Sequence, residues 1–127
     1  MSPTPYEQLG GDAKLRALVE RFYALMDSEP ELYGIRKLHP PTLEGSTNKL
    51  YMFLSGWMGG PQLFVEKFGH PMLRARHLPY AIGEAERDQW LACMGRAMED
   101  CEVPELLRLQ LMGAFAQTAY WMRNKQG

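Results

Sequence analysis

The chain has few of the residues that carry most protein chemistry, and it has no excess of either charge. Its 127 residues include two cysteines and three histidines, and its formal net charge at pH 7 is −1. A near-neutral chain has no dominant basic field to attract phosphate, which argues against a nucleic-acid or anionic-membrane partner. No apolar run approaches the roughly 20 residues of a membrane span, and the first residues lack the basic and apolar regions of a leader. We therefore expect a cytoplasmic protein without membrane association.

The scarce cysteines and histidines fit neither a disulfide nor a zinc site. Cys93 and Cys101 would lie about 12 Å apart along one helix, whereas a disulfide needs Cα atoms within about 7 Å. His70 and His77 would be separated by about 10.5 Å along a helix, too far to share one tetrahedral zinc ion. We expect free thiols and no structural zinc.

The apolar pattern is helical, and we predict an all-α fold in a single domain over residues 1–127. Apolar residues recur with the 3.6-residue period of amphipathic helices, whereas no alternating strand pattern of useful length is present. The predicted helices are a short one after Thr4, one from Asp12 to about Asp27, one from Thr42 to about Trp57, a short one over 63–68, one from Glu84 to about Cys101, and one from Pro104 to about Arg123. The long helices are expected to form two antiparallel pairs.

Capping residues and helix breakers set the expected boundaries. Thr4 is a typical N-cap, and the glycines at 10–11 are a typical helix stop. Asp12 and Thr42 are predicted as the N-caps of the next two long helices. Residues 30–41 are interrupted by three prolines and a glycine, so we predict a linking segment with at most a short turn there.

The segment from Gly69 to Tyr80 is the most informative part of the chain. Pro71 suits the first position of a helix and Pro79 prevents its continuation, so the segment is too short to build a core of its own. Yet it presents His77 beside Arg76. A neutral imidazole can ligate a metal, and an arginine can hold an anion.

Two aromatic residues with polar tips extend this pattern. Tyr23 lies within the apolar stripe of the second predicted helix, and Trp90 lies on the long helix that follows His77. Taken alone, each aromatic is well explained as a core residue whose tip bonds to a carbonyl, and a lone histidine is more often a core or cap residue than a ligand. Taken together, a metal-ligating histidine, acid-binding arginines and buried aromatic donors indicate a haem pocket.

Five stretches of the chain, in order, resemble the truncated haemoglobins of group II. The stretches are Arg21–Tyr23, Met52–Leu54, Gly59–Pro61, Gly69–Pro79 and Arg87–Met94. They follow in the same order over residues 21–94, more than half of the chain, so the resemblance is specific. It implies a two-over-two α-helical sandwich around one haem b, with O2 and other diatomic gases such as NO and CO as ligands.

The resemblance also implies a role for individual residues. It makes His77 the proximal iron ligand. It places in the distal ligand pocket Tyr23, His39, Ser46, Leu50 and Trp90. It places against the haem Lys49, Phe53, Arg76 and Trp90, with Arg76 and Lys49 as propionate anchors. Two positions depart from the common pattern: His39 stands where many members carry phenylalanine or tyrosine, and Phe64 where a tyrosine is often found.

Several donors in one pocket would favour slow oxygen release. Tyr23, Trp90 and His39 are candidate donors to bound oxygen, and each such bond is worth roughly 1.5–3 kcal/mol, or about ten- to a hundredfold in release. We predict a haem protein that binds oxygen and releases it slowly, as a monomer or weak dimer. The alternatives are a haem redox enzyme acting on nitric oxide or peroxide, which would need a separate reductase, and a helical interaction module without haem.

Overall fold

The computed structural model describes residues 2–70 and 83–122, with side chains up to residue 120. All regular structure in these ranges is helical, which confirms the predicted all-α fold. The elements are α1 (Pro5–Leu9), α2 (Asp12–Ser28), the 3-10 turn η1 (Pro30–Leu32), α3 (Tyr33–Arg36), α4 (Glu44–Trp57), α5 (Leu63–Phe68), α7 (Glu84–Asp100) and α8 (Glu105–Met122). The bounds of the long helices agree closely with those predicted from the sequence.

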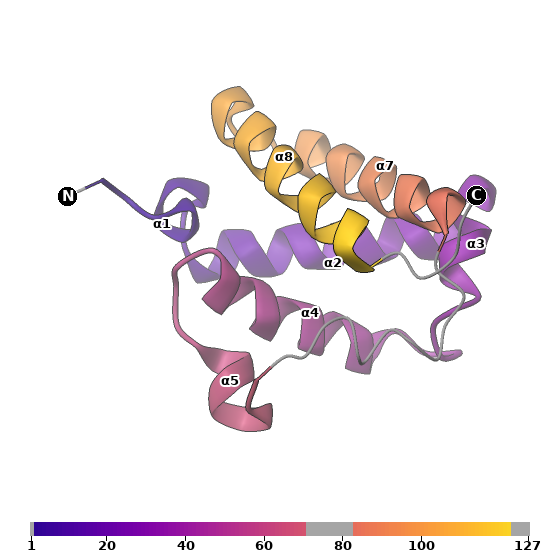
Figure 1. Cartoon of the computed structure of the whole chain (residues 1–127), viewed down its shortest axis with the longest axis horizontal. Helices are drawn as coiled ribbons and strands as arrows, with labels where there is room; N and C mark the ends of the chain where they lie inside the picture. Colours follow the sequence, from indigo (N-terminus) through magenta and orange to yellow (C-terminus); the bar gives the residue numbers. More distant parts are fainter. Residues whose placement is uncertain (1, 71–82, 123–127) are drawn as a thin grey trace.

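The four long helices form two antiparallel pairs, as predicted. Helix α2 lies beside α4, and α7 lies beside α8 (Figure 1). Helix α2 also packs along α7, so it is the central helix of the sandwich. Leu15, Leu18 and Phe22, on the inner face of α2, have no exposed surface. Their spacing of three and four residues is what places them on one helix face.

The first helix has the predicted boundaries. Thr4 accepts a hydrogen bond from the backbone N–H of Glu7, and the Glu7 side chain accepts one from the backbone N–H of Thr4. Gly10 ends the helix in the left-handed region, with φ of 118°, where a glycine has no steric penalty. This reciprocal capping satisfies backbone donors that the first turn of a helix otherwise leaves unpaired.

Two predicted N-caps are wrong. The N-cap of α2 is Gly11, and Asp12 is already the first helical residue. The Asp12 carboxylate caps no backbone N–H and accepts a hydrogen bond from the Tyr51 hydroxyl on α4 instead. The N-cap of α4 is Leu43 rather than Thr42, and no side chain caps that helix. Both predictions rest on a local signal. The Asp12 side chain is engaged in a tertiary contact instead of capping, and α4 starts one residue later than a cap at Thr42 would require.

The contact between Asp12 and Tyr51 is part of a brace between α2 and α4. The guanidinium of Arg16 lies over the Tyr51 ring, with Cζ 4.2 Å from the ring centroid, an arrangement that favours a cation–π interaction. The hydrogen bond to Asp12 is the main cause that raises the pKa of Tyr51 above 10.0. The brace joins the first turn of α2 to the second half of α4 and fixes the spacing between the two antiparallel helices there.

The linking segment holds more structure than predicted. It contains both η1 and α3, each about one turn long, and Leu32 and Ile35 are buried against the core. These two apolar side chains supply the packing that a purely polar link would lack. They hold the segment firmly between α2 and α7.

The two cysteines are free thiols, as predicted. Cys93 is buried on α7 and its thiol donates to the backbone carbonyl of Phe22, with 3.2 Å between sulfur and oxygen. Burial raises the pKa of Cys93 to about 12. Among the helices within the described residues, none is both long and apolar enough to span a bilayer.

Candidate functional site

Two residues predicted in the distal pocket lie side by side. Tyr23 comes from α2, and His39 follows α3; their ring centroids are 5.7 Å apart with nearly perpendicular planes. Phe22 packs edge-on against Tyr23 at 5.0 Å between centroids. The structure therefore brings together a phenol and an imidazole that are 16 residues apart in the chain.

Trp90 joins this cluster to the other side of the sandwich. Its ring centroid lies 5.2 Å from that of Phe22 and 5.3 Å from that of Phe115 on α8. Phe115 in turn stacks on Trp57 of α4, with 4.7 Å between centroids and 15° between planes. A continuous wall of aromatic rings thus runs from α2 across α7 and α8 to α4. We call these residues, from Phe22 and Tyr23 to Trp57, the aromatic wall.

The polar tips of Tyr23 and Trp90 have no hydrogen-bond partner among the described residues. Tyr23 is only 8 % exposed, and its burial raises the pKa well above 10.0. The hydroxyl therefore keeps its proton throughout the neutral range. Each tip is therefore a donor that a bound guest with an acceptor atom could engage.

One face of α4 presents the other predicted pocket residues. Ser46, Leu50 and Phe53 recur at helical spacing and are each half-buried. The fully covered face of α4 is a different one, made of Tyr51, Leu54 and Ser55. Leu50 and Phe53 pack against the core from its border and stay partly uncovered.

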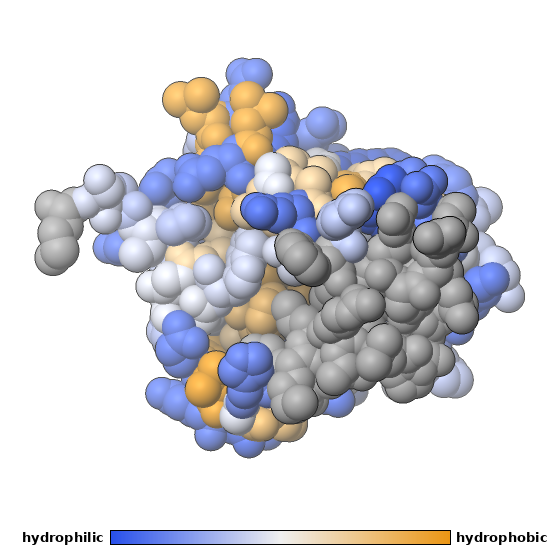
Figure 2. Space-filling model, viewed as in Figure 1, coloured by the Kyte–Doolittle hydropathy of each residue, from blue (hydrophilic) through white to orange (hydrophobic). Residues whose placement is uncertain are grey.

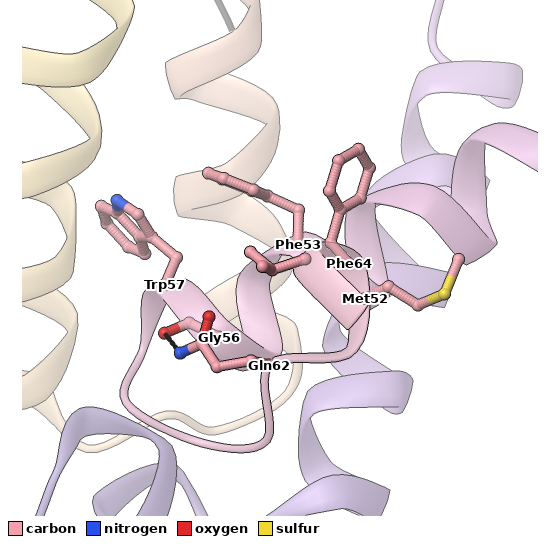
Figure 3. Close-up of a pocket in the computed structure, with 7 residues that line it drawn as sticks. Met52, Phe53, Gly56, Trp57, Gln62 and Phe64 are labelled. Atoms are coloured by element: carbon pink, nitrogen blue, oxygen red, sulfur yellow. Dashed lines mark hydrogen bonds between the residues drawn. The ribbon is translucent and has the colours of Figure 1, made fainter. Parts of the chain in front are cut away.

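A cavity of about 220 Å³ lies beside this face of α4 (Figure 3). Phe53 from α4 and Phe64 from α5 point to the same side, 6.2 Å apart between ring centroids and nearly perpendicular. Across the end of α4, the Gln62 side chain donates to the backbone carbonyl of Gly56 at 3.1 Å. The complete lining is Met52, Phe53, Gly56, Trp57, Gln62, Phe64 and Val65. Figure 2 shows hydrophobic surface in a hollow between α8 and α4.

His39 is held in one tautomer by the backbone. Its Nδ1 lies 2.8 Å from the carbonyl oxygen of Ile35. A carbonyl oxygen only accepts, so Nδ1 is the nitrogen that carries the hydrogen and donates. In the neutral ring the lone pair is then on Nε2, which accepts hydrogen bonds. The sequence predicts His39 as a candidate donor to bound oxygen. To donate from Nε2, the ring would have to be the doubly protonated imidazolium.

Two residues that sequence reasoning missed hold His39 in place. The Gln89 carboxamide on α7 accepts a hydrogen bond from the backbone N–H of Ile35 at 3.1 Å. Arg36 donates to Asp27 and to the backbone carbonyls of the two prolines at 40–41, at 2.7–2.9 Å. These bonds fix the chain on both sides of the imidazole. No local signal marks Gln89, apart from its place next to Trp90.

Replacing Gly34 by alanine is expected to loosen this support. A Cβ atom on Gly34 would lie 2.6 Å from both polar atoms of the Gln89 carboxamide, so Gln89 must move and its bond to Ile35 is lost. Gly45→Ala is the matched control, because in the described structure nothing lies within 4 Å of its Cβ position. Relative to that control, we expect Gly34→Ala to lower the free energy of unfolding by about 1–3 kcal/mol in urea titrations. Equal stability of the two variants would contradict the role of Gln89.

The remaining predicted site residues do not belong to the described cluster around Tyr23 and His39. Lys49 is exposed on α4, with its Nζ 6.0 Å from the centroid of the Phe68 ring. His70 is exposed directly after α5. Arg76 and His77 lie outside the described residues, so their predicted roles as anion anchor and metal ligand stay predictions.

Comparison with known proteins identifies the family to which this chain belongs. The sequence profile of the bacterial-like globin family matches residues 4–124. This chain belongs to that family. The globin is 40% identical over 121 residues to the group 2 truncated haemoglobin YjbI of Bacillus subtilis, covering 95% of this chain and 89% of the relative.

Solved structures agree with this assignment. The globin superposes on the group II 2-on-2 haemoglobin of Agrobacterium tumefaciens with a TM-score of 0.94 and 48% identity, covering 99% of this chain and 97% of the other. It superposes on a truncated, oxygen-avid haemoglobin of Bacillus subtilis with a TM-score of 0.87 and 39% identity, covering 96% and 100%. The predicted resemblance to group II truncated haemoglobins is confirmed, and membership of the globin family supports haem-based ligand binding.

The described residues of the globin fit a flat, apolar cofactor. Trp57 and Trp90 of the aromatic wall are only partly buried, and so is Phe53 on the half-buried face of α4, so apolar ring surface remains for a porphyrin to bury. The unpaired donors of Tyr23 and Trp90 provide the small number of polar groups that orient a ligand in such a pocket. The chemistry of this lining therefore agrees with the family.

Proposed function

We propose that this globin binds haem b and holds oxygen at its iron with slow release. The observation that carries the proposal is the pair of donors, the Tyr23 hydroxyl and the Trp90 indole N–H, without acceptors among the described residues and set in an apolar aromatic wall. Such donors are stabilised when a polarised diatomic ligand accepts from them. The B. subtilis relative described as oxygen-avid supports the same conclusion.

Individual residues of this chain would hold the cofactor. His77 would bind the iron through its imidazole, Phe53 and Trp90 would pack on the apolar macrocycle, and Arg76 and Lys49 would pair with its carboxylates. When bound, haem supplies an iron with one open coordination position for a diatomic gas. Lys49 is exposed, so its ammonium can move from the Phe68 ring to a carboxylate at small cost.

The distal residues decide how long the gas stays. Tyr23 donates through its hydroxyl, because burial keeps that group protonated, and Trp90 donates through its indole N–H. With Nδ1 donating to the Ile35 carbonyl, the neutral His39 ring has no second N–H to offer the gas. It packs beside the Tyr23 ring and leaves the single Tyr23 hydroxyl hydrogen to the ligand. Ser46 and Leu50 line the pocket from α4. Two donated bonds of roughly 1.5–3 kcal/mol each would slow release by several orders of magnitude.

An absorption spectrum of the purified protein tests the proposal directly. The ferric protein is recorded first, then the dithionite-reduced protein, then the reduced protein under carbon monoxide. We expect a Soret band that shifts on reduction and again with the gas, as a histidine-ligated iron with a reachable sixth position requires. A chain that forms no stable Soret band after haem is added would refute the proposal.

A further inference from the structure

Helix α8 has an apolar face that points away from the core. Leu107, Leu111 and Phe115 form its inner face and are buried. The opposite face carries Leu106, 83 % exposed, and Leu109, 61 % exposed. Two small exposed residues and a tyrosine continue that face along the helix: Gly113, Ala116 and Tyr120. We call these five residues, from Leu106 to Tyr120, the outer stripe.

The spacing of the outer stripe is that of a helix-pairing seam. Its members follow one another at intervals of three, four, three and four residues, which is the heptad pattern of paired helices. A helix that is apolar on all sides is normally buried on all sides, but here one side faces solvent. Figure 2 shows hydrophobic surface gathered over the start of α8, where Leu106 and Leu109 are exposed.

The outer stripe carries no charge that a charged partner could recognise. From Leu109 to Met122 the chain has no acidic or basic residue. The carboxamides of Gln110 and Gln117 flank the stripe along its length, and Glu105 and Arg108 flank only its first turn. A carboxamide donates and accepts, so it pairs with a copy of itself. The chemistry of this face therefore matches that of an identical face.

Gly113 lies at the middle of the outer stripe and leaves room for close approach. A Cβ atom placed there would meet no described atom within 4 Å. Small residues at the crossing point allow two helix backbones to come near each other, while larger side chains pack on either side. In an antiparallel pair centred on Gly113, Leu106 of one chain would face the partner's Tyr120.

We propose that the outer stripe is the interface of a symmetric homodimer, in which α8 packs antiparallel against the α8 of a second copy around Gly113. The exposed parts of the two leucines and the tyrosine amount to about 400 Å² per chain, which is within the roughly 300–600 Å² of the largest, often functional, patch on a monomer. This is less than the roughly 800 Å² per partner of a standard stable interface. The dimer is therefore weak. It covers the face of α8 opposite to Phe115, so it leaves the aromatic wall untouched.

Sedimentation of the haem-loaded protein over a concentration series tests the proposal. We expect wild-type protein to pass reversibly from monomer to dimer, with half-association at micromolar to submillimolar concentration, of the order expected for a small interface. Gly113→Glu should weaken the dimer by at least about tenfold, because it places two carboxylates at the crossing point. The monomer tolerates this change, since the site is open and glutamate is a better helix former than glycine.

Gly45→Glu on α4 is the matched control, because it makes the same exchange at an open, exposed helical position. It should associate like wild type. A wild-type mass that stays monomeric up to about 1 mM, or a Gly113→Glu variant that dimerises as well as wild type, would overturn the proposal.

Cross-linking identifies the residue at the two-fold axis. In a Cys101→Ser background, Gly113→Cys should form a disulfide-linked dimer under mild oxidation, because a residue on the axis meets its own copy within the roughly 7 Å that a disulfide allows. Gly45→Cys in the same background should remain monomeric. Equal cross-linking of the two variants would mean random collision, and it would refute the axis at Gly113.

Discussion

The His77→Gly variant is expected to lose most of its haem on gel filtration and to show no histidine-ligated ferrous spectrum. Glycine removes the imidazole proposed as the only protein ligand to the iron, while the aromatic wall that packs against the ring remains. Added imidazole should occupy the vacated space and restore the Soret band. Absorption spectra of the variant, recorded with and without imidazole after reconstitution with haem, provide the measurement.

His70→Gly is the matched control for this experiment. His70 lies seven residues earlier, at the end of α5, and is exposed. The control should retain haem and give wild-type spectra. If His77→Gly also kept its haem and spectra, the assignment of the axial ligand would be wrong. Loss of haem in both variants would show that the whole segment, and not one imidazole, secures the cofactor.

Replacing Tyr23 by phenylalanine is expected to accelerate oxygen dissociation by roughly ten- to a hundredfold. The change removes one hydroxyl donor and keeps the ring that packs on Phe22 and faces His39. A hydrogen bond to a polarised acceptor is worth roughly 1.5–3 kcal/mol, and each 1.4 kcal/mol is about a factor of ten. Stopped-flow displacement of oxygen by carbon monoxide measures the rate.

Tyr51→Phe is the control for the loss of a tyrosine hydroxyl. The Tyr51 hydroxyl donates to Asp12 in the brace between α2 and α4, so its removal should lower stability and leave oxygen dissociation unchanged. The double variant Tyr23→Phe, Trp90→Leu should release oxygen faster than either single variant. Unchanged release in Tyr23→Phe would mean that Trp90 alone retains the ligand.

The helices of this globin were largely predictable because their signals are local. Thr4 with Glu7, and Gly10 with its left-handed backbone, determine the bounds of α1 within a few residues. Asp12 misled the prediction, since its side chain bonds to Tyr51, 39 residues further along the chain. The sequence around a capping residue does not show which distant side chain will bind it once the chain has folded.

The distal cluster was predictable in composition and unpredictable in detail. The resemblance to truncated haemoglobins selected Tyr23, His39 and Trp90, and the structure places the first two rings side by side and links Trp90 to them through Phe22. The tautomer of His39 depends on a backbone carbonyl, and the support from Gln89 acts across 54 residues. Neither leaves a periodic or spacing signal. They emerge only when α3 and α7 are placed together.

The buried thiol of Cys93 gives this globin a core that resists oxidants. With a pKa of about 12, only about one molecule in a hundred thousand carries the thiolate at pH 7. The thiolate is the form that peroxides attack to give sulfenic acid. A protein proposed to hold oxygen at iron meets such by-products at close range. Because the Cys93 thiol is buried on α7 against the Phe22 carbonyl, we expect it to react with peroxide far more slowly than an exposed cysteine.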